Sequence, residues 1–394
     1  MITPRLGFYK VGTEIFADKT PAVLRASQLN QPIEWNFHQD VFNKIDWKTE
    51  PETGLDEFYR MRAQQIRDEF DYVIVLCSGG GDSTNVIWSF LRNRIKVDEV
   101  IAGAPFSGLF NWQASNKDKS ASNTISETFY VQIPLVQEIH EFDPSIRITL
   151  HDYFENMLNY KTDDWLLRSG DWIHPTSAAR YDFENHKHIV DLAESGKKIA
   201  IVYGIDKPLL LINKENNIEF VFNDLAVNVQ RPPFKKWYPN VENVLFYYTP
   251  DMPLMMVKQS HALSKWIFRP EQARTVLPWV LDQRVTKIQT FEQNRFRHSV
   301  YERAIIPCLY PSTHRPVFQG HKPTRLFLGE HDDWFYKLHH NTRVYEMIDS
   351  DFRNFYKMID PKFLNERKTG YKIERFTYVI GSVDQFKPNQ NVIL

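Results

Sequence analysis

Residues 78–84, with the sequence SGGGDST, combine three glycines with three hydroxyl side chains and one carboxylate. Glycine lets the main chain approach a ligand closely. A helix that starts here offers unpaired N–H groups and the positive end of its dipole, which favours phosphate. The carboxylate suits this site if a divalent cation joins it to the phosphates. The expected ligand-binding residues are Ser78, Gly79, Gly80, Gly81, Asp82, Ser83 and Thr84.

The residues around this segment predict how it is held. Tyr72–Cys77 (YVIVLC) is a continuous apolar run, typical of a strand buried on both faces of a parallel sheet. The same alternation of strand and helix continues along the chain, which predicts βαβ units and an α/β fold with a doubly wound parallel sheet. The other predicted strands are 97–102, 146–150 and 199–203, and the predicted helices are 56–70, 85–93, 125–142 and 177–194.

Three parts follow from this pattern. Residues 1–55 form an N-terminal extension, 56–230 an α/β domain, and 231–394 a mostly helical region that serves a substrate or partner. The predicted helices of the last part, separated by prolines, are 255–268, 270–281, 291–304 and 334–356. Residues 244–248 are one more strand or an edge extension, and 372–383 are a strand pair or coil.

The segment SGGGDS resembles the PP-loop, S-G-G-x-D-S, of the N-type ATP pyrophosphatases. This superfamily includes the synthetase half of asparagine synthetase, GMP synthetase, NAD synthetase and tRNA thiolation enzymes. The segment lacks the Gly-Lys-Ser/Thr ending of a Walker A loop and the spacing of a Rossmann fingerprint. A glycine-rich turn without a ligand is the alternative, but such a turn does not need three glycines between Ser and Asp-Ser.

The resemblance implies an adenine nucleotide alpha hydrolase-like fold, with ATP and Mg²⁺ as cofactors. Members split ATP between the α and β phosphates and attach AMP to a substrate oxygen. Residues 78–83 would hold the pyrophosphate, and Asp82 would bind magnesium. Adenine would lie near the end of the second strand, at Ala102 and Gly103.

A second candidate segment follows the predicted strand 199–203. Ligands of parallel sheets bind at the carboxyl ends of strands, and Gly204-Ile-Asp-Lys207 loosely resembles a motif of PP-loop enzymes at that place. Asp206 is the expected second metal ligand and Lys207 the expected phosphate-neutralising cation, so both join Asp82 as catalytic candidates. The alternative is a surface turn with a solvated ion pair. Gln259 and His261 are weaker candidates for substrate contact.

Composition limits the function classes. The chain has 42% hydrophobic and 25% charged residues, ordinary values for a globular protein. Its 48 Lys and Arg nearly balance 49 Asp and Glu, so no strong nucleic-acid signal exists. Cys77 and Cys308 are the only cysteines, which disfavours sulfur transfer and a four-Cys zinc site. No apolar run is long enough for a membrane span and no secretory signal is recognisable, so we expect a cytoplasmic protein.

These observations favour a ligase similar to asparagine synthetase that lacks the glutaminase domain, because residue 2 is Ile and not the nucleophilic cysteine. It would adenylate a carboxylate or carbonyl oxygen of a small molecule or nucleobase and release pyrophosphate. An amine or ammonia would be the nucleophile, and a separate donor of it is the expected partner. The alternative is a non-catalytic nucleotide-binding module for regulation or assembly, whose aromatic-rich helical region contacts partners.

Overall fold

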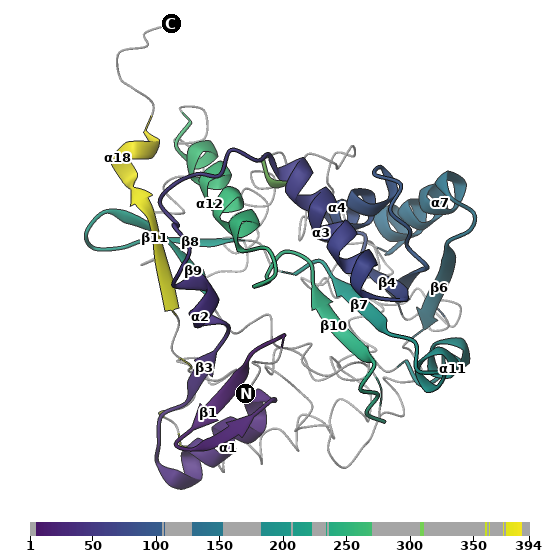
Figure 1. The fold of residues 1–394 in the computed structure, drawn as a ribbon, viewed down its shortest axis with the longest axis horizontal. Helices are drawn as coiled ribbons and strands as arrows, with labels where there is room; N and C mark the ends of the chain where they lie inside the picture. The colour runs from purple at the N-terminus through teal and green to yellow at the C-terminus, as the bar shows by residue number, and fades with distance from the viewer. Residues whose placement is uncertain are drawn as a thin grey trace, which may run out of the picture.

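The structure, a computed structural model, describes residues 5–104, 106, 128–152, 183–205, 208–222, 234, 236–269, 308–310, 359–360, 362, 373 and 376–387. Its centre is a parallel sheet of five strands in the order β10-β7-β4-β5-β6 (Figure 1). The strands are β4 (Tyr72–Cys77), β5 (Glu99–Ala104), β6 (Arg147–Asp152), β7 (Ile199–Tyr203) and β10 (Val241–Leu245).

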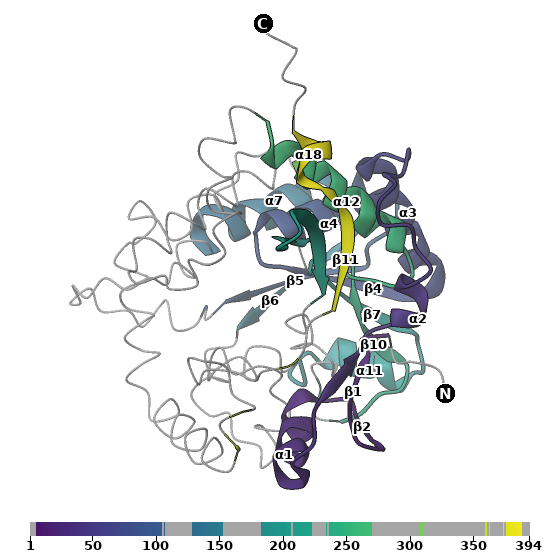
Figure 2. The same cartoon turned by 90° about the vertical axis from the view of Figure 1, so that its left-hand side faces the viewer.

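The order of the strands reverses at β4. The chain runs from β4 outward through β5 to β6, and then returns to the other side of β4 for β7 and β10. Helices α3 (Leu55–Glu69), α4 (Gly81–Leu91) and α7 (Ile133–Phe142) lie on one face of the sheet, and α11 (Lys187–Glu194) lies on the other (Figures 1 and 2). Helices on both faces of a parallel sheet are the arrangement of a doubly wound α/β fold.

The burial of the strands explains why three of them, β4, β5 and β7, were recognisable. All five side chains of β7 are buried, as are most of those of β4 and β5, so their sequences are continuous apolar runs. Two predictions, 72–77 and 199–203, match β4 and β7 at both ends. The fifth strand, β10, overlaps the predicted segment 244–248 but begins earlier, at Val241, and pairs with β7 along the edge.

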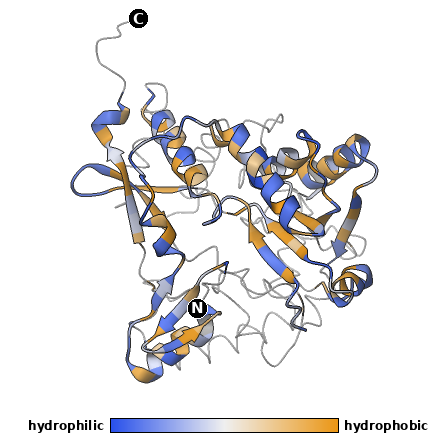
Figure 3. Cartoon of the chain, in the orientation of Figure 1, coloured by the Kyte–Doolittle hydropathy of each residue, from blue (hydrophilic) through white to orange (hydrophobic). Residues whose placement is uncertain are grey.

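Helix α3 illustrates how the helices pack. Its buried residues recur three or four positions apart and form one stripe along the helix: Leu55, Phe58, Tyr59, Arg62, Ala63 and Ile66. Figure 3 shows both hydrophobic and hydrophilic residues along this helix. Met61 lies outside the stripe and is 40% exposed. Arg62 lies inside the stripe and is the exception that needs a partner.

Two further sheets lie beside the central one. The first, β2-β1-β3, is antiparallel and comes from the N-terminal segment, with helices α1 and α2. The second, β11-β9-β8, joins the middle of the chain to its C-terminal part. The bounds are β1 (Phe8–Val11), β2 (Glu14–Phe16), α1 (Lys19–Leu29), β3 (Glu34–Asn36), α2 (Gln39–Phe42), β8 (Leu209–Ile212), β9 (Asn217–Phe222), α12 (Pro253–Ile267), β11 (Phe376–Ser382) and α18 (Val383–Phe386).

Stacked aromatic rings fasten β11 to its neighbours. Trp47 stacks on Tyr378 with ring centroids 4.7 Å apart, and Phe222 stacks on Phe376 at the same distance. Such pairs add stability beyond the area they bury. The aromatic residues described here are therefore core, and they tie β11 near the C-terminus to the segment that follows α2.

Several predicted elements differ from the structure or lie outside the described residues. Helix α11 begins only at Lys187, after a turn, whereas the prediction began at residue 177. The described end of the predicted segment 372–383 is a single strand, β11, followed by the start of α18. The predicted helices 270–281, 291–304 and 334–356 lie outside the described residues. Within the described part, no helix has both the length and the apolar character needed to cross a lipid bilayer.

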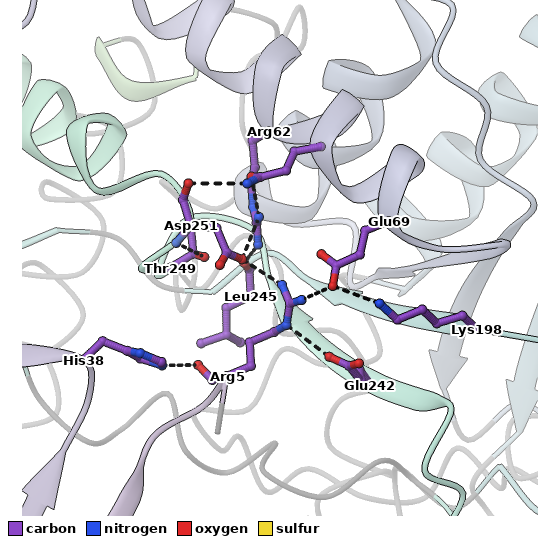
Figure 4. A network of polar contacts seen from close by, with 10 residues as sticks. Arg5, His38, Arg62, Glu69, Lys198, Glu242, Leu245, Thr249 and Asp251 are labelled. Carbon is purple, nitrogen blue, oxygen red and sulfur yellow. Dashed lines mark hydrogen bonds and ion pairs between the residues drawn. The ribbon is translucent and has the colours of Figure 1, made fainter. Parts of the chain in front are cut away.

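A network of charges fastens the N-terminal segment to the central sheet (Figure 4). Arg62, fully buried, donates to Asp251 at 3.0 Å and to the carbonyl oxygen of Leu245 at the end of β10, also at 3.0 Å. Arg5 donates to the same carboxylate at 2.7 Å and to Glu242 at 3.1 Å. Burial lowers the pKa of Arg62 to about 10, so this side chain stays charged at neutral pH.

We predict that Asp251→Asn destabilises the protein strongly, because two arginines, one fully buried, lose their shared carboxylate. The free energy of unfolding should fall by about 2–3 kcal/mol, as expected when one partner of a buried pair is removed. Urea unfolding measures this loss. Asp191→Asn, at an exposed pair with Lys187 on α11, is the matched control and should change stability by less than about 0.5 kcal/mol. Similar losses in both variants would contradict the role of the network.

A candidate phosphate site at the carboxyl end of β4

The segment SGGGDS forms the connection from β4 into α4. Cys77 ends the strand, Gly80 is the extended N-cap residue, and Gly81 is the first residue of the helix. The helix therefore begins four residues before the predicted start at 85, and the last glycine of the run belongs to its first turn. The first N–H groups of α4 face the end of the central strand, which is the arrangement that binds anions at helix N-termini.

Hydrogen bonds made by the hydroxyl groups of Ser78 and Ser83 shape this bend. The Gly80 N–H donates to Ser78 Oγ at 3.2 Å, and Ser83 Oγ donates to the Gly80 carbonyl oxygen at 3.1 Å. The two hydroxyl oxygens lie 3.2 Å apart. Ser78 is exposed whereas Ser83 is buried. Ser83 therefore stabilises the bend from inside, and Ser78 is the hydroxyl placed at the surface of the loop.

Two glycines are required by close packing of main chain against main chain. Gly79 has a φ of +79°, and a Cβ there would lie 2.9 Å from the main chain of Gln132. A Cβ on Gly204, directly after β7, would lie 3.0 Å from the Asp82 carbonyl carbon and the Ser83 nitrogen. The loop is thus held between the segment before α7 and the end of β7, beside the point where the strand order reverses. Open α/β sheets bind ligands at this point.

Asp82 is held by tyrosines from the second half of the chain. The Tyr310 hydroxyl donates to Asp82 Oδ1, and the Tyr247 hydroxyl donates to the Asp82 carbonyl oxygen at 3.0 Å. Asn85, one turn along α4, donates to the Tyr247 hydroxyl at 2.8 Å. Burial, with Asp82 nearby, raises the pKa of Tyr310 well above its ordinary value. Tyr310 therefore remains a neutral donor to the carboxylate across the physiological pH range.

The charge network at β10 positions one of these tyrosines. Arg62 binds the carbonyl oxygen of Leu245, and pairing with β7 continues past the strand, with the Phe246 N–H 3.0 Å from the Tyr203 carbonyl oxygen. Tyr247 is the next residue and reaches the loop. The rings of Tyr247 and Tyr310 lie 5.5 Å apart. Charges at the outer edge of the sheet and the SGGGDS loop are thus linked through one short segment.

The expected adenine residues lie on the strand next to the loop. Ala102 and Gly103 belong to β5, and Ala102 pairs directly with Cys77. Gln132 reaches across both strand ends, since its Nε2 donates to the Cys77 carbonyl oxygen at 2.7 Å and approaches that of Gly103 at 3.4 Å. The structure therefore brings the SGGGDST loop and the expected adenine strand together around one glutamine.

The other sequence candidates fall into two groups. Asp206 and Lys207 lie outside the described residues, although Gly204 just before them touches the loop. Gln259 and His261 are buried in α12. Gln259 donates to the Tyr59 hydroxyl, and His261 Nε2 donates to the Trp47 carbonyl oxygen. Their polar atoms serve packing between α12 and its neighbours.

The chemistry of the thiols and carboxylates restricts the site. Cys77 is buried, and burial raises the pKa of Cys308 to about 12, so at neutral pH Cys308 is a thiol and not a nucleophilic thiolate. Among the described residues, no three His, Cys, Asp or Glu side chains are grouped to hold a metal. Mg²⁺ does not need such a cage, because one or two carboxylates plus substrate phosphates suffice. Asp82 at the start of α4 fits that requirement.

Gln132, Tyr247 and Tyr310 were not candidates from the sequence. Tyr247 lies near the carboxyl end of the predicted segment 244–248, a position that could have identified it. Gln132 and Tyr310 lie 50 and more residues from the loop and carry no motif, so no local signal points to them. No protein-family model matches this chain, and no curated protein matches it either. The resemblance to PP-loop proteins therefore depends on the loop itself and on its place in the sheet.

We predict that Gly79→Ala destabilises the protein more than Gly196→Ala. Both glycines have φ near +80°, but an added Cβ at Gly196 meets no atom within 4 Å, whereas at Gly79 it meets the main chain of Gln132. Gly196→Ala should lower the free energy of unfolding by about 1–2 kcal/mol through backbone strain alone. Gly79→Ala should lower it by roughly 3 kcal/mol or more, since strain and collision add.

Chemical denaturation of both variants measures the difference. Equal losses would show that the segment before α7 does not press on the loop as described.

Proposed function

We propose that this chain is an AMP-forming, ATP-dependent ligase of the ATP pyrophosphatase type. The observation that carries the proposal is the SGGGDS bend between the central strand β4 and the N-terminus of α4, at the reversal of the strand order. In this proposal the sheet is that of an adenine nucleotide alpha hydrolase-like fold, with the triphosphate over the loop and the adenine beside β5.

The proposed reaction has two steps. An oxygen of the substrate carboxylate or carbonyl attacks the α-phosphorus of ATP, the bond between that phosphorus and the α,β-bridging oxygen breaks, and pyrophosphate leaves. A nitrogen nucleophile, ammonia or an amine, then attacks the activated carbon, AMP leaves with the bonding electrons, and the nitrogen loses a proton to solvent. Magnesium, when bound, neutralises charge on the phosphates.

The residues of the chain bind and orient the nucleotide. The first N–H groups of α4 and the exposed hydroxyl of Ser78 are donors for the pyrophosphate oxygens. Asp82 would hold the cation, and the Tyr310 hydroxyl fixes the direction of its carboxylate. Asp206 and Lys207 stay proposed as the second metal ligand and the phosphate-binding cation. In-line attack needs positioning and charge stabilisation more than covalent catalysis by the protein.

The hydrogen bonds that Asp82, Ser78 and Ser83 already make favour the second candidate, a non-catalytic nucleotide-binding module. Asp82 already accepts a hydrogen bond from Tyr310, and Ser78 and Ser83 are bonded within the loop. A module that binds nucleotide without turnover needs these groups only for the shape of the loop. The two candidates differ in the fate of the bond between the α and β phosphates, so the products of ATP distinguish them.

We predict that the chain converts α-labelled ATP into AMP and pyrophosphate when Mg²⁺, ammonium and a mixture of small carboxylic acids and nucleobases are present. Asp82→Asn should lower this rate about 100-fold or more, because a metal ligand and a charge at the phosphates are lost. Asp191→Asn is the control for the same chemical change and should leave the rate unchanged. Thermal unfolding of both variants checks that they fold.

Formation of ADP in place of AMP would contradict the proposal that the chain is an ATP pyrophosphatase. Binding of α,β-methylene-ATP by calorimetry, combined with no turnover in any mixture, would favour the non-catalytic module. Absence of nucleotide binding would reject both.

A further inference from the structure

Gln132 lies at the carboxyl edge of the sheet, beside the carbonyl groups at the ends of two neighbouring strands. It is the last residue of the π-helical turn η1 (Thr128–Gln132), directly before α7. Its side-chain amide nitrogen donates to the carbonyl oxygens that end β4 and β5, on Cys77 and Gly103. Single π turns inside helices are uncommon and are frequent at functional sites.

The other half of this amide has no partner among the described residues. Gln132 is only 3% exposed, and its Oε1 atom is buried without a hydrogen bond. Buried amide oxygens are almost always paired, because an unpaired acceptor away from water is costly. The amide nitrogen donates to two carbonyl oxygens. If the amide flipped by 180°, its oxygen would face these two acceptors, so the flip cannot give Oε1 a donor. Oε1 of Gln132 is therefore a buried hydrogen-bond acceptor that needs a donor.

The position of this acceptor relative to the phosphate loop suggests the ligand. The main chain of Gln132 lies against Gly79 within the loop, and its side chain points across to β5, one strand away. Neighbouring strands are about 4.8 Å apart. In the proposed function, the phosphates lie over the loop and the base lies beside β5, so Gln132 is within reach of the base.

We propose that Gln132 selects the base: its Oε1 accepts a hydrogen bond from the exocyclic 6-amino group of adenine. This inference depends on the proposed function, since it assumes that the loop binds nucleotide phosphates. A base with a carbonyl oxygen at position 6, such as hypoxanthine or guanine, places a second acceptor against Oε1 and is repelled. Gln132 is a specificity-determining residue in this proposal.

The test compares binding of ATP, ITP and purine riboside triphosphate to the full chain by calorimetry. The three nucleotides differ at position 6, which carries an amine, a carbonyl or hydrogen, and ITP also carries a proton on N1. The wild-type protein should bind ATP about tenfold more tightly than purine riboside triphosphate, the size of one hydrogen bond, and should bind ITP most weakly. Equal affinities for the three nucleotides would overturn the proposal without any variant.

Gln132→Met keeps the length of the side chain and removes the amide. ATP affinity should fall about tenfold, while ITP affinity stays within about twofold or rises, so the preference for ATP disappears. Inorganic tripolyphosphate probes the loop alone and should bind both proteins equally. An ATP-to-ITP ratio that Gln132→Met leaves unchanged would reject the role of Gln132.

The two proposals fail in different ways. If neither tripolyphosphate nor any nucleotide binds the wild-type protein, the proposed function is wrong. If tripolyphosphate and nucleotides bind but without preference at position 6, the proposed function stands and the inference on Gln132 is wrong. Should Gln132→Met fail to fold in thermal unfolding, the three-nucleotide series on the wild-type protein still decides the question.

Discussion

The loop after β4 depends on main-chain atoms that approach one another more closely than any side chain permits. Gly79 lies against Gln132 on one side, and Gly204 lies against Asp82 and Ser83 on the other. With a Cβ at either place, the end of a strand or the start of a helix would have to move. This double contact brings the segment before α7, the start of α4 and the end of β7 together, and the candidate site exists only where these three meet.

The surrounding structure makes this contact rigid. Helix α4 is buried along nearly its whole length, between the sheet and α3, so its first turn cannot retreat from the loop. On the other side, the Arg62–Asp251 pair and the pairing beyond β7 hold the segment that carries Tyr247. Buried ion pairs contribute little net stability compared with apolar residues, but they are costly to break. This network therefore acts by fixing where the end of β10 lies.

The same packing explains why polar residues collect behind the loop. Tyr247 and Tyr310 are almost fully buried, and their hydroxyl groups bond to the main chain and side chain of Asp82. Burial keeps both phenols neutral, so they act as donors and add no negative charge beside a site proposed for phosphate. The ring of Tyr247 packs against Tyr59 of α3 and against Tyr310, while Gln132 covers the neighbouring strand ends. In the proposed function, the side chains that pack around the loop are thus also those that surround the ligand.

The sequence by itself determined the central strands, the helix that follows β4 and the loop between them. These depend on local patterns, namely apolar runs for strands buried on both faces and glycine with hydroxyl residues at a bend. It did not determine the antiparallel sheets, because β11 pairs with β9 from more than 150 residues away and such pairing leaves no local signature. Only the tertiary structure decided that Gln132, Tyr247 and Tyr310 join the loop, because side chains distant in sequence meet there through the reversal of the strand order.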